Sequence, residues 1–167
     1  MGPEDRPARP LYTPAERQRR DATPWTLVQG VLAPVQFAIF LVSVVLVLRA
    51  LVTGQGQGAA EMSVVAKTLA LYAIMITGSI WEKAVFGRWL FAPAFFLEDV
   101  VSMLVLALHS AYLAALVTGA LAERPLLLLA LAAYATYLVN AGQFLLKLRA
   151  ARLEGSGGRG PRLAEAL

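Results

Sequence analysis

The sequence contains no cysteine and a single histidine, His109. The first absence excludes disulfide scaffolds, thiolate metal sites and cysteine nucleophiles, and the second excludes metal sites built from several histidines. Charged residues are also scarce, at 16% of the 167 residues, against about 25% in a typical globular chain. So few charges cannot supply the polar surface that a soluble domain of this length needs.

Hydrophobic residues are correspondingly abundant. They make up 58% of the chain, against about 45–50% in a typical globular protein, and the mean hydropathy is +0.62. This composition excludes a soluble enzyme and a disordered chain. It predicts an all-α integral membrane protein.

Four apolar segments are long enough to cross a bilayer, which takes about 20 helical residues. They cover about residues 25–48, 63–84, 97–122 and 125–146. A glycine-rich turn at 53–58 and a Glu-Arg-Pro turn at 123–125 separate neighbouring segments. We therefore predict an antiparallel bundle of four transmembrane helices in a membrane domain at 25–150. A basic segment at 1–24 precedes it, and a disordered basic tail at 151–167 follows it.

Basic residues indicate the orientation of this bundle. Twelve of the fifteen Lys and Arg residues lie near the two termini or in the loop 82–90, and three lie on the opposite side: Arg49, Lys67 and Arg124. By the positive-inside rule both termini are cytoplasmic. The net charge of +4 is therefore a topological signal, and without a recognised binding motif it does not indicate nucleic acid.

Polar residues within the spans recur at helical spacing and form one stripe per helix. The stripes are Gln29, Gln36 and Ser43; Thr68, Tyr72, Ser79 and Glu82; Glu98, Ser102, His109 and Tyr112; Thr136, Asn140, Gln143 and Lys147. Four stripes in four helices predict a polar interior, with a pocket open toward the cytoplasm. The alternative is that these groups only hydrogen-bond the helices to one another.

Carboxyl groups at the cytoplasmic ends of the spans are the candidates for acid–base chemistry: Glu98 and Asp99, with Glu82 as an alternate partner. Adjacent carboxylates at a membrane boundary repel each other and are partly desolvated, so one of them retains a proton. Successive helical residues point about 100° apart, so we expect Glu98 to face the pocket and Asp99 to modulate it. Alternatively, both stabilise the helix N-terminus, and Glu82 pairs with Lys83 at the interface.

The connection 82–99 holds five aromatic residues: Phe86, Trp89, Phe91, Phe95 and Phe96. It predicts a platform for a large flat ligand, in which Trp89 and Phe95 contact the ligand. A basic rim on the same side is expected to meet the carboxylate of the ligand: Lys83, Arg88, Lys147 and Arg149. The alternative is an interfacial aromatic belt. Asn140 and Gln143 are expected to position a water molecule. His109, about 16 Å deeper than Glu98, is expected to bind the ligand, or else to hydrogen-bond a neighbouring helix.

Several long segments resemble 3-vinyl bacteriochlorophyllide hydratases. They are residues 11–30 and 32–37, Ile-Trp-Glu-Lys at 80–83, Phe-Ala-Pro-Ala-Phe-Phe-Leu-Glu-Asp at 91–99, and 133–144, and the resemblance spans about 11–153. It implies addition of water to the ring-A vinyl group of chlorophyllide a or a bacteriochlorophyllide, which yields a 1-hydroxyethyl pigment. It also implies a multi-pass protein of the bacterial inner or photosynthetic membrane, with other pigment-synthesis enzymes as partners. It carries over no catalytic residues.

The residues fit such a substrate. Vinyl hydration needs a proton donor and a base but no redox cofactor, and no nucleotide-binding motif is present. The expected magnesium is that of the pigment, for which His109 is a candidate axial ligand, and no protein metal site is expected. Two other classes remain open: a small four-helix transporter and a non-catalytic pigment-binding or assembly protein.

Overall fold

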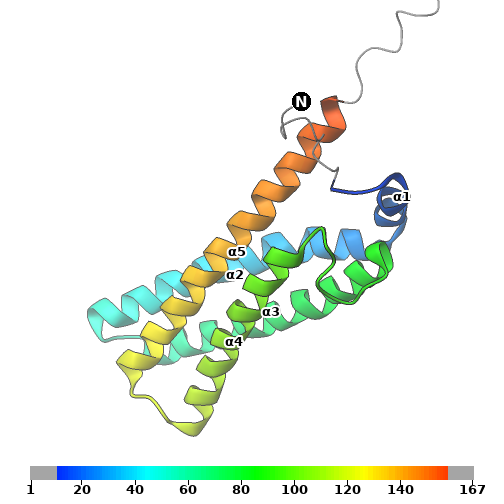
Figure 1. The fold of residues 1–167 in the computed structure, drawn as a ribbon. Helices are drawn as coiled ribbons and strands as arrows, with labels where there is room; N and C mark the ends of the chain where they lie inside the picture. Colours follow the sequence, from blue (N-terminus) through cyan, green and yellow to red (C-terminus); the bar gives the residue numbers. More distant parts are fainter. Residues whose placement is uncertain (1–10, 158–167) are drawn as a thin grey trace, which may run out of the picture.

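The computed structural model describes residues 11–157, with side chains described for 11–152. These residues form five α-helices, shown in Figure 1: α1 (Pro14–Ala22), α2 (Pro24–Thr53), α3 (Gln57–Phe86), α4 (Phe96–Thr118) and α5 (Glu123–Gly157). Of the expected terminal segments, residues 1–10 and 158–167 lie outside the described residues.

Helices α2 to α5 are each long and apolar enough to cross a membrane, which confirms the all-α class and the number of candidate spans. Several boundaries differ from those expected. Helix α2 extends to Thr53 and α3 begins at Gln57, so both are longer than the apolar runs that predicted them. Helix α4 ends at Thr118 because Gly119 adopts the left-handed conformation (φ 64°) that terminates helices. Helix α5 continues to Gly157, past the expected end of the span near Leu146, because residues 145–153 are mostly strong helix formers without proline.

The N-terminal helix α1 was not expected, although the sequence carries its signal. Thr13 and Glu16 form a capping box, in which the Glu16 N–H donates to Thr13 Oγ1 (3.3 Å) and the Thr13 N–H donates to Glu16 Oε2 (2.8 Å). Thr23 ends α1, and Pro24 begins α2 directly after it. This short connection holds α1 at one end of the bundle.

The long helices pack as two hairpins, α2 with α3 and α4 with α5. In the first, Gln29 donates to Thr77 Oγ1 (2.7 Å), and the hydroxyls of Ser43 and Ser63 lie 2.6 Å apart. Contacts between the hairpins are sparser and come mainly from α2 with α5 and α3 with α4. One of them joins the Tyr72 hydroxyl to Ser110 Oγ (2.8 Å). The hairpins are therefore the tightly packed units.

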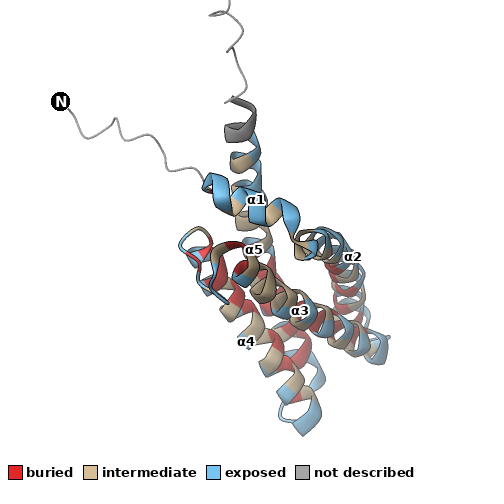
Figure 2. Ribbon diagram, turned by 90° about the vertical axis from the view of Figure 1, so that its right-hand side faces the viewer, coloured by how far each residue is buried: buried red, intermediate tan, exposed pale blue. Residues whose placement is uncertain are grey.

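Polar as well as apolar side chains are buried inside the bundle, and many large apolar side chains lie exposed on its outside; Figure 2 shows the burial of the described residues. Among the buried residues are Gln36, Ser43, Lys67, Thr68, Glu82, Glu98, Asp99, Ser102, His109 and Asn140. Exposed side chains include Val52 (84% exposed) and Val117 (85% exposed). The predicted polar interior is confirmed. Water disfavours such an outer surface, whereas lipid favours it.

Lys67 does not lie where the basic-residue count placed it. It was counted with the basic residues of the loops opposite the termini, but its side chain is fully buried between the helices. The reason is its position on α3: it lies ten residues after Gln57, on the face that carries Val64, Thr68 and Leu71 into the core. The count for the side opposite the termini therefore falls to Arg49 and Arg124.

We expect Lys67→Met to stabilise the isolated protein. The substitution removes a buried ammonium without a hydrogen-bond acceptor and keeps the length of the side chain, so the free energy of unfolding should rise by about 1–3 kcal/mol. The thermal midpoint in detergent measures the change. As a control, Ser43→Ala removes interhelical hydrogen bonds to Ser63 and Tyr134 and should lower stability by about 0.5–1 kcal/mol. A lower midpoint for Lys67→Met would contradict this account.

Candidate active site

Two carboxyl groups meet at the end of the bundle where α3 finishes and α4 begins. Glu82 lies in the last turns of α3 and Asp99 in the first turn of α4, and both side chains are buried. Each accepts a hydrogen bond from one of two successive backbone N–H groups, that of Ala92 to Glu82 and that of Phe91 to Asp99, so the two carboxyls lie close together. Two buried carboxylates at close range repel each other, which favours the retention of a proton by one of them. The pair can therefore supply an acid and a base.

This carboxyl pair also holds the segment between α3 and α4. The Phe91 N–H donates to Asp99 Oδ2 (2.8 Å), and the Ala92 N–H donates to Glu82 Oε2 (3.1 Å). Phe91 has φ 58°, in the left-handed region that costs an aromatic residue about 1–3 kcal/mol. The two successive N–H groups thus face the two carboxyls, and those hydrogen bonds help to maintain the strained backbone.

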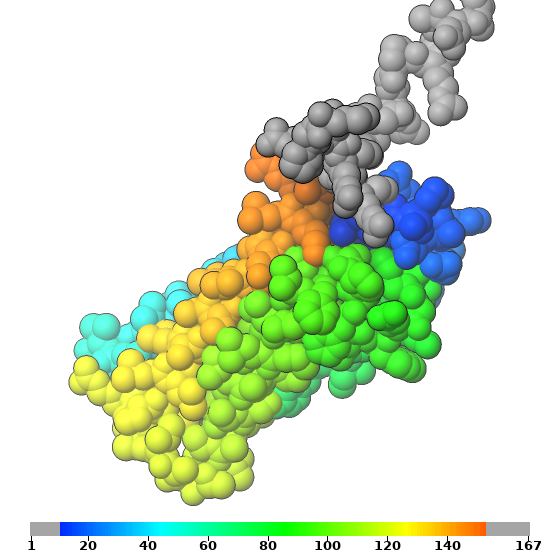
Figure 3. Space-filling model, viewed as in Figure 1, coloured from blue at the N-terminus to red at the C-terminus, as the bar shows by residue number. Residues whose placement is uncertain are grey.

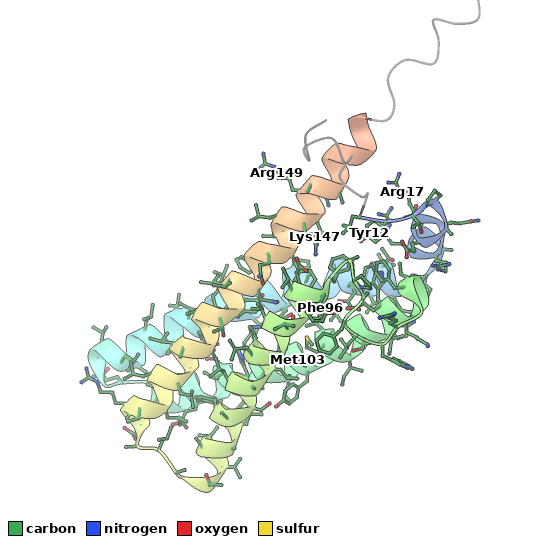
Figure 4. The ribbon with its side chains drawn as sticks, viewed as in Figure 1. Tyr12, Arg17, Phe96, Met103, Lys147 and Arg149 are labelled. Atoms are coloured by element: carbon green, nitrogen blue, oxygen red, sulfur yellow. The ribbon has the colours of Figure 1, made fainter. Side chains whose placement is uncertain are left out.

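Glu98 is directed toward α5 rather than toward the carboxyl pair. Its Oε2 accepts a bond from Lys147 Nζ (2.6 Å), which also donates to the Ala94 carbonyl. Figure 4 shows Lys147 on α5 beside the start of α4. The sequence predicted that the adjacent residues Glu98 and Asp99 point in different directions, with Glu98 toward the pocket and Asp99 as its modulator. Both are buried, because helices on both sides of the α4 N-terminus, α5 and α3, each provide one with a partner.

Asn140 fastens α5 to α4. Its Nδ2 donates to the Glu98 carbonyl (2.8 Å) and to Ser102 Oγ (3.0 Å). The sequence predicted that Asn140 positions a water molecule, but these bonds already use its amide nitrogen. Gln143, the other residue assigned to water, has a buried Oε1 without a hydrogen-bond partner. Of the two amides, Gln143 is thus the one whose oxygen has no hydrogen-bond partner among residues 11–152.

The aromatic residues divide into an inner and an outer group. Phe95 is 2% exposed and stacks on Phe144 with ring centroids 5.8 Å apart, and Tyr12, Trp81 and Phe86 also contact it. Trp89, Phe91 and Phe96 are exposed, at 60%, 37% and 51%. Of the two rings that were expected to contact a ligand, Trp89 is accessible, whereas Phe95 belongs to the packed inner group.

The expected basic rim lies beside these exposed rings. Lys83 and Arg88 are both exposed. Lys83 Nζ donates to the Gly87 carbonyl (3.0 Å) and lies 5.9 Å from the Trp89 ring centroid. A cation next to an exposed aromatic ring suits a flat ligand that carries a carboxylate.

Helix α1 covers the neighbouring side of this end, as Figure 3 shows. Tyr12 is buried against Phe86 and Phe95, and Arg19 Nε donates to the Val85 carbonyl (2.7 Å). Burial raises the pKa of the Tyr12 phenol, so it stays neutral beside Arg20, whose guanidinium lies 4.8 Å from its ring. A surface hollow of about 460 Å³ follows α1, lined by Tyr12, Pro14, Arg17, Gln18 and Asp21. Tyr12 stands outside the polar stripes and the loop 82–99, and its only signal in the sequence is the capping box of Thr13 and Glu16 that follows it.

His109 lies deeper in the bundle, ten residues beyond Asp99, or about 15 Å along α4. Its side chain is fully buried and its Nδ1 is 2.8 Å from the Val105 carbonyl oxygen. Glu98 and His109 are both buried on α4, as the stripe predicted. Within residues 11–152, no three Asp, Glu or His side chains are grouped as ligands for a metal ion.

Lys147→Met should destabilise the protein, because it leaves the Glu98 carboxylate buried without its cation. Lys147 is 25% exposed, so water screens part of the loss, and we expect about 1–3 kcal/mol. The single variants Lys147→Met and Glu98→Gln and the double variant Glu98→Gln/Lys147→Met form a double-mutant cycle. Their unfolding midpoints measure it. The double variant should recover most of the loss. A double variant as unstable as Lys147→Met would show that the pair does not act as a unit.

The described residues together define an all-helical protein with four potential membrane spans and a buried pair of carboxyl groups at one end. The model of one protein family, 2-vinyl bacteriochlorophyllide hydratase (BCHF), matches residues 12–150. This chain belongs to that family.

Two curated relatives carry the same name. The protein of Rhodobacter capsulatus is 62% identical over 152 residues, which cover 91% of this chain and 88% of the relative. The protein of Cereibacter sphaeroides is 62% identical over 151 residues, which cover 89% of this chain and 92% of the relative. No solved structure matches the chain significantly.

Proposed function

We propose that this chain adds water to the vinyl group of a bacteriochlorophyllide, the substrate in the names of its relatives, or of chlorophyllide a. The names of the relatives number this vinyl group 2. The family name given with the resemblance above numbers it 3. The observation that carries the chemical part of the proposal is the buried carboxyl pair Glu82–Asp99, whose members accept the N–H groups of two successive residues and so can present an acid and a base together. Vinyl hydration requires both.

The reaction balances with this pair and one water molecule. The protonated carboxyl donates its proton to the terminal vinyl carbon, and the π electrons form the new C–H bond. The resulting cation, next to the ring, is delocalised into the macrocycle. A water oxygen then bonds to the cationic carbon while the ionised carboxylate takes a proton from that water. The product carries a 1-hydroxyethyl group, and the pair again holds one proton, so no redox cofactor is consumed.

The residues around the pair support distinct roles. Trp89 and its exposed neighbours Phe91 and Phe96 offer a face for the flat pigment, and Lys83 and Arg88 suit its carboxylate. Gln143, with its free buried oxygen, is suited to hold the water. Glu98 is a positioning residue in this proposal, because its ion pair with Lys147 fixes α4 against α5. Asn140 and Phe95 likewise act through packing and hydrogen bonds.

A purely structural role is the alternative for the carboxyl pair, since both groups accept N–H bonds from the segment 87–95. Replacing the carboxyl groups by amides affects the two roles differently. The oxygen of Gln or Asn still accepts those N–H bonds, whereas an amide does not transfer a proton at neutral pH. Isosteric amides therefore separate catalysis from support of the loop.

Asp99→Asn and Glu82→Gln should each lower the hydration rate by about a hundredfold or more, the scale of general acid–base catalysis. The assay supplies chlorophyllide a to membranes that contain equal amounts of each variant, and mass spectrometry detects the pigment heavier by one water. Glu98→Gln is the matched control, and we expect a loss of less than about tenfold from it, because Glu98 lies outside the proton-sharing pair.

Proteolysis at Arg88, in the exposed connection, reports whether the loop remains in place. Trypsin should cleave the variants Asp99→Asn and Glu82→Gln as slowly as it cleaves the wild type. Near wild-type hydration by both amides would contradict the catalytic role, and lost activity together with faster cleavage would favour the structural one.

We also propose that the four long helices form an antiparallel transmembrane bundle in the bacterial inner or photosynthetic membrane, with both termini cytoplasmic. The hydrogen-bonded hairpins and the excess of basic residues on the side of the termini support this arrangement. The active-site end would then face the cytoplasm, where a pigment carboxylate finds Lys83 and Arg88.

Reporter fusions test this topology. A reporter after residue 167 and one inserted at 54–58 should report opposite sides of the membrane, because α2 separates the basic N-terminal region from the turn after Thr53. Fusion at 120–122, in the connection between α4 and α5, should agree with the insertion at 54–58. If the reporters at 167 and 54–58 lie on one side, the orientation is wrong.

A further inference from the structure

A second group of polar side chains lies in the middle of the bundle, away from the carboxyl pair. Four atoms there are buried and have no hydrogen-bond partner among the described residues: Gln36 Nε2, Lys67 Nζ, His109 Nε2 and Tyr112 Oη. They come from α2, α3 and α4. Unpartnered polar groups inside a membrane bundle are costly and mark functional positions.

The hydrogen bond of His109 determines which ring nitrogen is free. A carbonyl oxygen only accepts, so the contact of 2.8 Å with the Val105 oxygen requires that Nδ1 carries the proton. Nε2 of the neutral ring is then a bare lone pair in the core. Histidines that bind metals almost always donate their other N–H in this way, often to a backbone carbonyl.

Lys67 and His109 border one aromatic cluster. Lys67 Nζ lies 3.6 Å from the ring centroid of Tyr137, and the His109 ring lies 5.8 Å from that of Tyr134. Phe40 contacts both tyrosine rings, at 4.9 Å and 5.3 Å. A metal ligand, an ammonium donor and flat apolar rings therefore lie at one level of the bundle.

This level also lies between the two hairpins. Lys67 and Phe40 belong to the hairpin of α2 and α3, and His109, Tyr134 and Tyr137 belong to that of α4 and α5. Because contacts between the hairpins are sparser than those within them, their separation is the least disruptive way to admit a ligand. The connection 87–95, which links the hairpins, is the one that the carboxyl pair holds.

We propose that His109 Nε2 is the axial ligand of the magnesium in the pigment substrate, with the macrocycle between the two hairpins and Lys67 donating to one of its oxygens. This rests on the proposed function for the identity of the ligand. A magnesium chlorin has a partner for each of these groups. Its magnesium is a Lewis acid for the free imidazole nitrogen, its oxygens accept hydrogen bonds from the ammonium, and its flat apolar body packs against the aromatic rings.

The two sites would hold different parts of such a pigment. The magnesium lies at the centre of the macrocycle and the vinyl group at its edge, so different residues must hold the metal and react with the vinyl group. His109 lies about 15 Å along α4 from Asp99, and Ser102 and Asn140 lie between it and the carboxyl pair. The hairpins must therefore separate at this end to bring the vinyl edge of a pigment held at His109 to the carboxyl pair.

The first test uses the single histidine of the chain. Full-length protein labelled with ¹⁵N-histidine carries the label only at His109. In detergent, the Nε2 resonance should move when magnesium chlorophyllide a is added and should stay in place with the magnesium-free pigment. Equal shifts with both pigments, or none with either, would overturn the ligation.

The second test compares affinities. The wild type should bind the magnesium pigment about tenfold or more tightly than the magnesium-free pigment, and His109→Leu should abolish that preference, with added imidazole restoring it in His109→Gly. Thr68→Val is the matched control, because Thr68 is also fully buried and its hydroxyl also bonds the carbonyl four residues earlier, that of Val64. It should retain the preference. Lys67→Met should weaken the binding of both pigments alike.

These outcomes are independent of the hydratase assay. A wild type that hydrates the pigment without a magnesium-dependent shift or preference would refute the ligation by His109 and leave the proposed function intact. A wild type that binds the magnesium pigment through His109 but never hydrates it would refute the proposed function instead. Water or a free metal ion as the usual occupant would appear as an Nε2 resonance that the pigment does not move, which also overturns the proposal.

Discussion

A carboxylate among apolar helices must accept hydrogen bonds, pair with a cation or share a proton, because isolated burial of its charge costs several kcal/mol. The end of this bundle meets that requirement in the first two ways. Glu98 pairs with Lys147, while Glu82 and Asp99 accept backbone N–H groups. The orientation of α4, the path of residues 87–95 and the attachment of α5 all depend on these bonds.

The same bonds connect the chemistry to the shape of the molecule. Phe91 keeps its left-handed backbone next to the carboxyl that accepts its N–H, and the exposed rings of Phe91 and Phe96 lie 5.8 Å apart at their centroids. The groups proposed to transfer protons thus also hold the segment that offers the aromatic surface. A change in the protonation of the pair therefore alters the hydrogen bonds that hold the connection between the hairpins.

Along α4 the polar side chains form a series, from the carboxyls through Ser102 to His109 and Tyr112. The outer members are fully hydrogen-bonded, whereas the inner ones retain free atoms next to aromatic rings. Free polar atoms lower the stability of the isolated protein, and their retention is understandable where a ligand satisfies them. This distinguishes the inner group from polar residues such as Ser43 and Gln29, whose bonds to neighbouring helices account for their presence.

Much of the architecture follows from the sequence alone. The apolar runs determine four long helices, because a backbone in apolar surroundings must satisfy its own hydrogen bonds, and the helical spacing of Ser43, Ser102, His109 and Asn140 places them inside. The aromatic and basic residues of the connection 82–99 likewise indicate a site at that end. These properties depend on local periodicity and composition, so they can be predicted without knowledge of which helices are neighbours.

Tertiary structure decided the partners. Periodicity shows that Glu98 and Asp99 point about 100° apart, but only the placement of α3 and α5 gives Asp99 to Glu82 and Glu98 to Lys147. Lys67 appears in the sequence as one more topological charge, and the packing of α3 buries it against Tyr137. Phe95 and Trp89 are equivalent as aromatic residues of one loop, yet one is enclosed by Tyr12, Trp81 and Phe144 and the other is exposed. Each of these differences arises from contacts between residues distant in the chain, which a one-dimensional pattern does not contain.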